Sequence, residues 1–163
     1  MSTVIELNVL AQVDALQNRY IVALDGKDIA GWADCFSQRE DASYICRSAE
    51  NEVNNWPIAL MLDDCRGRIE DRIMFITKIW AGTFQDYRTR HFVQRVSCDR
   101  EGEAWRVRSH FSIEYTLDPN RSQTLATGVY DDVVEIAGGE ARFVSKKAIY
   151  DTTILPQYIV YPF

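Results

Sequence analysis

The first part of the chain carries the hydrophobic spacing of helices. Between residues 4 and 24, apolar side chains recur every three or four positions, as they do along the buried face of an amphipathic helix. Gly26 follows as a stop signal, and Asp28 is placed to cap a second, shorter helix that runs through residues 32–36. These two segments predict a helical hairpin.

The middle of the chain combines short extended segments with one more helix. Residues 41–47 alternate weakly and are rich in Tyr and Ile, which favours a strand, whereas residues 51–57 are typical of a loop. Residues 58–62 form a short apolar run, either a strand or an extended entry to a helix that begins at residue 63 or 64. The expected buried face of that helix is Ile69, Ile73, Ile76 and Trp80.

The second half changes to the period of two that is typical of strands. Residues 91–98 and 105–115 alternate on either side of a polar turn, so we expect them to pair as a hairpin. Residues 124–136 and 141–150 predict a second hairpin, closed by the glycine pair at 138–139. Between the two hairpins, residues 117–122 are typical of a polar loop.

Helices followed by long antiparallel strands predict an α+β fold. The chain has 163 residues, of which 47% are hydrophobic, a size and composition that suit one packed domain over residues 1–163. We expect a cone: a strongly curved antiparallel sheet with the N-terminal helices packed on its concave face. This arrangement would bury the apolar stripes of the helices against one face of the strands.

The net charge of -6 disfavours binding to nucleic acids or to anionic lipid surfaces. The N-terminal segment is periodic and carries an acidic residue early, unlike a secretory signal, and no apolar run approaches the roughly 18 residues of a membrane span. We therefore expect a cytoplasmic protein. The four cysteines lack the spacing of a metal knuckle, and we expect buried thiols at Cys35, Cys46, Cys65 and Cys98.

The small number of histidines excludes most metal chemistry. With only His91 and His110, a three-histidine zinc site is impossible within one chain, and no P-loop, EF-hand or GxGxxG motif is present. A site with two histidines and one carboxylate could use Asp99 or Glu114 as its acid. The alternative is that His91 fixes the end of a strand and that His110 faces solvent or a partner.

Two other hypotheses concern a pocket in the cone and a cationic segment. Acid–base catalysis in the pocket would use Asp41, Tyr44, His91 and His110; the alternative is that Tyr44 fills the core and Asp41 begins the strand. The segment DYRTRHFVQRV, residues 86–96, holds Arg88, Arg90 and Arg95. These arginines could dock a partner protein, or they could form ion pairs within the chain to Asp86, Glu70 or Asp71.

The apolar residues 152–163 at the end of the sequence require burial, either across their own sheet or against a partner. We expect them to be buried against a partner.

Four segments resemble the small (β) subunit of bacterial aromatic-ring-hydroxylating dioxygenases, which are Rieske non-haem iron oxygenases. They are DDCRGRIEDR, KIWAGTFQDYRTRHFVQRVSC, RSHFSIEY and IYDTTILPQYIVYPF. The resemblance covers most of the chain and implies a cone of the NTF2-like, or cystatin-like, type. The ending also resembles the branch that acts on salicylate-like or terephthalate-like aromatics.

This resemblance implies a non-catalytic structural subunit of an oxidoreductase that degrades aromatic compounds. The partner would be a large (α) subunit that carries the Rieske [2Fe-2S] cluster and the mononuclear Fe(II), with three large and three small chains and the small chains associating as a trimer. This chain would hold no cofactor. The implied interface residues are Arg88, Arg90, His91, Arg95, Tyr158, Tyr161 and Phe163. The alternative function is a stand-alone isomerase or dehydratase, or a small-ligand binding module, that uses the cone pocket.

Overall fold

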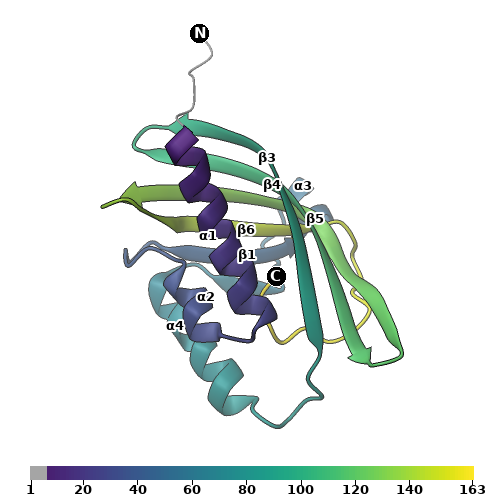
Figure 1. The fold of residues 1–163 in the computed structure, drawn as a ribbon. Helices are drawn as coiled ribbons and strands as arrows, with labels where there is room; N and C mark the ends of the chain where they lie inside the picture. Colours follow the sequence, from purple (N-terminus) through teal and green to yellow (C-terminus); the bar gives the residue numbers. More distant parts are fainter. Residues whose placement is uncertain (1–6) are drawn as a thin grey trace.

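A six-stranded, strongly curved sheet forms the body of the molecule, and three helices cover its concave face (Figure 1). The structure, a computed structural model, describes residues 7–163. The helices are α1 (Leu7–Asp25), α2 (Ile29–Asp34), α3 (Ala49–Val53) and α4 (Arg66–Met74), with a π-helical turn η1 (Phe75–Ile79) after α4. The strands are β1 (Ser43–Ser48), β2 (Met61–Asp63), β3 (Arg88–Glu101), β4 (Ala104–Asp118), β5 (Arg121–Ala137) and β6 (Glu140–Tyr150).

The predicted α+β cone is confirmed. The strands lie in the order β2-β1-β6-β5-β4-β3, and all neighbours are antiparallel except β1 and β6. The register shifts in β3, β4 and β5, and such bulges bend and twist a sheet. Helix α1 crosses the concave side, with α2 and α4 beside its C-terminal end (Figure 1).

The helical hairpin forms as predicted, although residues 4–6 of the expected first helix lie outside the described part. Helix α1 buries a stripe on the sheet side, made of Val13, Leu16, Tyr20, Ala23 and Leu24. Asp28 caps α2, since its Oδ1 accepts a hydrogen bond from the Gly31 N–H at 2.9 Å. Helix α2 ends at Asp34, two residues before the expected end, because Phe36 instead bridges to Phe143 in β6.

Two predictions for the middle of the chain need correction. The expected loop at 51–57 begins inside helix α3, which Ser48 caps through its hydroxyl oxygen. The expected helix from residue 63 or 64 starts later, at Arg66, because Asp63 pairs with Tyr44 in the sheet. Its last turn is π-helical rather than α-helical, with Trp80 N–H donating to the Phe75 carbonyl at 2.8 Å.

The hairpins form as expected, with shorter connections. Gly138 and Gly139 both have positive φ, +60° and +82°, as the tight turn between β5 and β6 requires. The expected loop at 117–122 is shorter than predicted, because β4 continues to Asp118 and β5 starts at Arg121. Asp118 Oδ1 closes this short turn by accepting from the backbone and side chain of Asn120.

The core inside the cone is unusually aromatic. Helix α1, helix α2, the segment after α2 and the inner faces of the strands contribute aromatic side chains, most of them in edge-to-face contact: Tyr20, Trp32, Phe36, Tyr44, Tyr130 and Phe143. Three of the predicted buried thiols are confirmed, whereas Cys65 is half-buried. Burial raises the pKa of Cys46 to about 12, so this thiol stays protonated and unreactive.

The chain ends inside its own cone. Phe163 is 1% exposed, its N–H donates to the Tyr44 hydroxyl at 2.8 Å, and its backbone oxygen accepts from the Tyr20 hydroxyl. Val160 is buried as well, and its N–H donates to Tyr87 at 3.0 Å. The last residues are therefore covered by their own chain, not by a partner as expected. Ile154, earlier in the tail, remains 82% exposed.

This arrangement predicts that Phe163 is a major contributor to stability. Phe163→Ala should lower the free energy of unfolding by about 3–5 kcal/mol, because it leaves a cavity against Phe111 and Tyr150. Tyr44→Phe should cost about 1–3 kcal/mol, since the buried Phe163 N–H loses its acceptor. Urea unfolding followed by circular dichroism measures both. A Phe163→Ala variant as stable as the parent would contradict this placement of the tail.

Candidate functional site

The cationic segment 86–96 is divided between the two faces of β3. Successive side chains of a strand point to opposite faces, and the burial pattern of β3 follows this rule. Thr89 and His91 are buried against the helices, whereas Arg88 and Arg90 are exposed on the outer face. The segment is therefore not one cluster but two separate groups with different surroundings.

On the inner face, His91 forms a closed pair with Asp25 at the end of α1. His91 Nδ1 lies 2.6 Å from Asp25 Oδ1, and the backbone N–H of His91 donates to Oδ2 at 3.1 Å. Thr89 adds a third hydrogen bond to this carboxylate, at 2.9 Å. Burial by itself would raise the pKa of Asp25, but the hydrogen bonds and charge of His91 outweigh it and hold this pKa below its ordinary value. The pair connects α1 to β3, in line with the alternative in which His91 fixes the end of a strand.

Arg95 is also used within the chain. It forms two hydrogen bonds with the Asp14 carboxylate of α1, at 2.8 and 3.1 Å. The predicted partners were wrong, since Glu70 pairs with Arg66, while Asp86 accepts from Tyr161. Asp14, the partner of Arg95, lies 81 positions away in the sequence, so the local spacing of charges could not indicate this pair.

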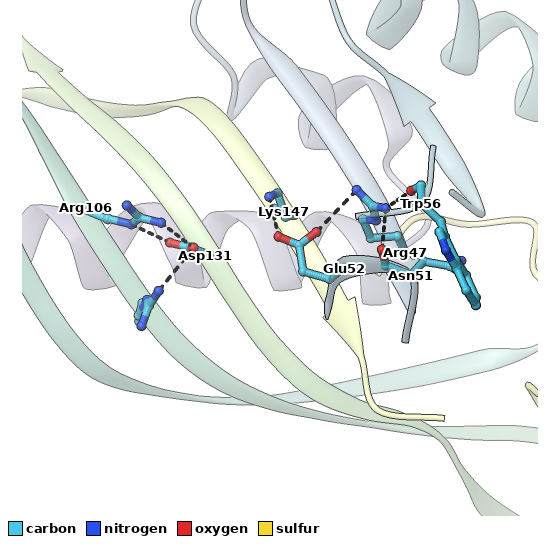
Figure 2. A network of polar contacts seen from close by, with 8 residues as sticks. Arg47, Asn51, Glu52, Trp56, Arg106, Asp131 and Lys147 are labelled. Carbon is cyan, nitrogen blue, oxygen red and sulfur yellow. Dashed lines mark hydrogen bonds and ion pairs between the residues drawn. The ribbon is translucent and has the colours of Figure 1, made fainter. Parts of the chain in front are cut away.

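The outer face of the sheet carries a row of charged side chains that crosses three strands and helix α3 (Figure 2). Asp131 in β5 accepts two hydrogen bonds from Arg106 in β4, at 2.9 and 2.7 Å, and lies 3.6 Å from Arg108. Lys147 stands opposite Asp131 in the register and pairs with Glu52 at 2.8 Å. Hydrogen bonds from Arg106 lower the pKa of Asp131.

The row continues to the edge of the sheet. Glu52 also pairs with Arg47 in β1, at 3.4 Å, and Arg47 donates to the carbonyl oxygens of Asn51 and Trp56 (Figure 2). Arg47 thereby holds the loop after α3 against the sheet. We call the cations of this face the outer cationic band: Arg47, Arg88, Arg90, Arg106, Arg108 and Lys147.

Sequence reasoning found only part of this band. Arg88 and Arg90 were singled out, whereas Arg106, Arg108 and Lys147 were not. The signal was present, since Arg106 and Arg108 occupy alternate positions at the start of the predicted strand 105–115, on either side of Val107. The missing information was which strands are neighbours, because β1 and β6 come together from opposite ends of the chain.

The proposed iron site is wrong for this chain. His91 lies on the inner face of β3, with its side chain 2% exposed, whereas His110 is exposed on the outer face of β4. Because the sheet separates them, they cannot share a metal ion. Within residues 7–163, no group of three His, Cys, Asp or Glu side chains is close enough to hold a metal.

The set proposed for acid–base catalysis is not assembled either. Asp41 is exposed in an ion pair with Arg39 at 2.7 Å, and His110 lies on the outer face. Tyr44 is fully buried, and burial raises its pKa well above the ordinary value while its oxygen holds the Phe163 N–H. Of the four residues, only Tyr44 and His91 face the interior. Tyr44 accepts a hydrogen bond from Phe163, and His91 pairs with Asp25.

One aromatic residue of the tail, Tyr161, packs over a lysine in the turn that follows α1. Tyr158 is 47% exposed and donates to the Gln85 carbonyl at 2.6 Å, and Tyr161 packs on Tyr87. The Lys27 ammonium lies 3.9 Å from the centre of the Tyr161 ring. Burial lowers the pKa of Lys27 to about 8. Of the three tail residues predicted at an interface, Tyr158 keeps the most exposed surface and Phe163 keeps almost none.

Among residues 7–163, no helix has the length and apolar character needed to cross a membrane.

Comparison with known proteins adds independent information. A family model described as "Ring hydroxylating beta subunit" matches residues 19–157. The small subunit of anthranilate 1,2-dioxygenase from Burkholderia cepacia is 25% identical over 153 residues, which cover 93% of this chain and 92% of the relative.

Solved structures agree with this match. A β subunit assigned to an aromatic-ring-hydroxylating dioxygenase of Novosphingobium aromaticivorans superposes with a TM-score of 0.78 at 26% identity, covering 91% of this chain and 94% of the other. The β subunit of benzoate 1,2-dioxygenase from Burkholderia mallei gives a TM-score of 0.67 at 26% identity, covering 93% of each chain.

The Asp25–His91 pair generates a pH-dependent prediction. Because the pKa of Asp25 is lowered by folding, its carboxylate stabilises the fold above the unfolded value of about 3.9 and this contribution disappears as the pH falls below it. Asp25→Asn should therefore cost about 1–2 kcal/mol at pH 7 and progressively less below about pH 4. Urea unfolding between pH 3 and 8 measures this difference. If the difference in unfolding free energy between the parent and Asp25→Asn stayed constant from pH 3 to 8, the stabilising role of the Asp25 carboxylate would be contradicted.

Proposed function

The chain belongs to the ring hydroxylating β-subunit family, and from this premise we propose that it acts as the structural small subunit of a cytoplasmic aromatic-ring-hydroxylating dioxygenase. The protein is the small subunit of an oxidoreductase complex. In our proposal, residues 1–163 form one domain that has no catalytic centre of its own. A large subunit carries the Rieske [2Fe-2S] cluster and the mononuclear Fe(II), and three large chains assemble with a trimer of small chains.

The placement of the histidines is the observation that carries this proposal. The two imidazoles lie on opposite faces of the sheet, and one of them is committed to Asp25. A Rieske cluster and a mononuclear iron each require two histidines at one site, so two imidazoles on opposite faces of the sheet fit neither centre. The iron chemistry of the complex is therefore assigned to the partner, and this chain contributes shape and surface.

The outer face of β3 and β4 is our candidate for the surface that contacts the large subunit. Phe92 is 62% exposed there and Val96, at the β-bulge of β3, is 57% exposed, although large apolar side chains are usually buried. They lie beside His110 and between the arginines of the outer cationic band. An apolar centre with a rim of arginines is the composition typical of protein interfaces, and it fits an acidic surface on the partner.

The substrate of the complex is proposed from the relatives. Anthranilate 1,2-dioxygenase and benzoate 1,2-dioxygenase are named for carboxylated aromatic rings, as is the salicylate-like or terephthalate-like branch that the tail resembles. We therefore propose a carboxylated aromatic substrate for the complex.

Co-expression with a candidate large subunit tests the proposal directly. Native mass spectrometry should show a complex of three large and three small chains. Iron analysis should find the metal in the large subunit and none in the purified small chain. Stoichiometric iron bound by the small chain alone, or turnover of an aromatic substrate by it, would contradict the proposal.

The docking face gives a mutational prediction. Phe92→Asp should weaken assembly with the large subunit about tenfold or more, because it places a carboxylate in the apolar centre of the interface. Val22→Asp is the matched control, since Val22 is a 70% exposed apolar residue on the opposite side of the sheet, in α1. Analytical ultracentrifugation of the purified chains measures both. Equal loss of assembly in the two variants would show that this face is not the interface.

A further inference from the structure

A cavity of about 420 Å³ lies between helix α1 and the concave face of β3, β4, β5 and β6. Its walls combine apolar side chains, namely Val13, Ile21, Val93, Val107, Val134 and Phe143, with polar ones that include Gln17 and Asp132. Concave sites of this size that offer both apolar surface and fixed polar groups are typical binding sites for small molecules. None of the roles described above uses this space.

The polar wall of the cavity contains a buried ion pair. Asp132 is fully buried, and its Oδ2 accepts a hydrogen bond from Lys146 Nζ at 2.8 Å. Lys146 is fully buried too, and it donates a second hydrogen bond to Gln17 Oε1 at 3.2 Å. Its ammonium group also lies over the rings of Tyr130, at 3.7 Å, and Phe143, at 4.3 Å. The lysine is therefore fully surrounded.

Two polar atoms of this group lack partners. Neither Asp132 Oδ1 nor Gln17 Nε2 has a hydrogen-bond partner among residues 7–163, and both residues border the cavity. Because a lysine can only donate, the amide oxygen of Gln17 must face Lys146, which leaves its NH₂ group free. A buried polar atom without a partner destabilises a fold, so these two atoms point to a missing ligand.

The free atoms define the chemistry of that ligand. Asp132 Oδ1 requires a donor, and Gln17 Nε2 requires an acceptor. Burial raises the pKa of Asp132 to about 6 against the opposing charge of Lys146, so the carboxyl is mainly ionised at neutral pH and accepts. A hydroxyl group both donates and accepts, and a phenolic hydroxyl is the stronger donor to a carboxylate.

The other charged groups of the cavity disfavour an anionic ligand. Arg95 borders the space, but both of its hydrogen bonds go to the Asp14 carboxylate, which also borders it. A carboxylated ring would meet the free oxygen of Asp132 without gaining an unpaired cation. A neutral ring avoids this repulsion and can pack against the valines and Phe143.

We propose that this cavity binds a small, neutral, hydroxylated aromatic ring, such as a phenol or a catechol. The ring hydroxyl donates to Asp132 Oδ1, a ring oxygen accepts from Gln17 Nε2, and the apolar side chains of the cavity pack against the ring. The proposal stands on the cavity alone and does not depend on the proposed role in assembly.

Titration calorimetry on the full chain at pH 7.5 tests the proposal, with catechol, phenol and benzoate as probes. Catechol or phenol should bind at one site with a Kd below about 1 mM, and benzoate should bind about tenfold more weakly or not at all. Binding of benzoate as tight as that of the hydroxylated rings would overturn the assigned chemistry. Absence of binding by both hydroxylated rings would overturn the site.

Two variants locate the binding. Val93→Phe fills the cavity and should weaken binding about tenfold, whereas Val22→Phe, the same change at an exposed position of α1 that does not border the cavity, should leave it within about twofold. Gln17→Glu keeps an acceptor for Lys146 but removes the free N–H, and should also weaken binding. Thermal unfolding checks that each variant folds. If Val93→Phe does not fold, Gln17→Glu decides, and unchanged affinity in a folded variant contradicts the proposal.

Discussion

Successive side chains of a strand must point to opposite faces of the sheet, and most features of this protein follow from that constraint. The concave face is closed by helices, so every second residue of β4, β5 and β6 enters an aromatic core or the cavity under α1. The other residues form the outer face, where the charged row and the exposed apolar residues lie. The same rule places His91 inside and His110 outside, so these two imidazoles cannot share a metal ion.

The parts of the fold that could be predicted from the sequence are those that depend on local spacing. The helix stripe of α1, the Asp28 cap and the glycine turn at 138–139 each leave a signal within a few residues. The short helix α3 also left a local signal, the Ser48 cap followed by Glu50 and Glu52, but the loop-like composition of residues 51–57 outweighed it. The π-helical turn after Met74 left no signal that distinguishes it from an α-helical turn. The tail was misjudged because its apolar composition required burial but did not identify the covering surface.

The candidate site was predictable to a smaller extent. Alternation within β3 was readable from the sequence, but the partners of its charged residues were not, since Asp14 and Asp25 approach it only once α1 has packed across the sheet. The buried pair of Asp132 and Lys146 left no sequence signal either. Each residue occurs in a strand where a charged side chain would ordinarily face solvent, and only the pairing of β5 with β6 brings them together.

The parallel pairing of β1 with β6 has a consequence for the order of folding. Strands β3 to β6 are joined by short turns, so their contacts are local and can form early. Strand β1 must wait for a partner about a hundred positions further along the chain, and the closure of that long loop is entropically slow. The four-stranded half is thus suited to serve as the nucleus on which the N-terminal half condenses.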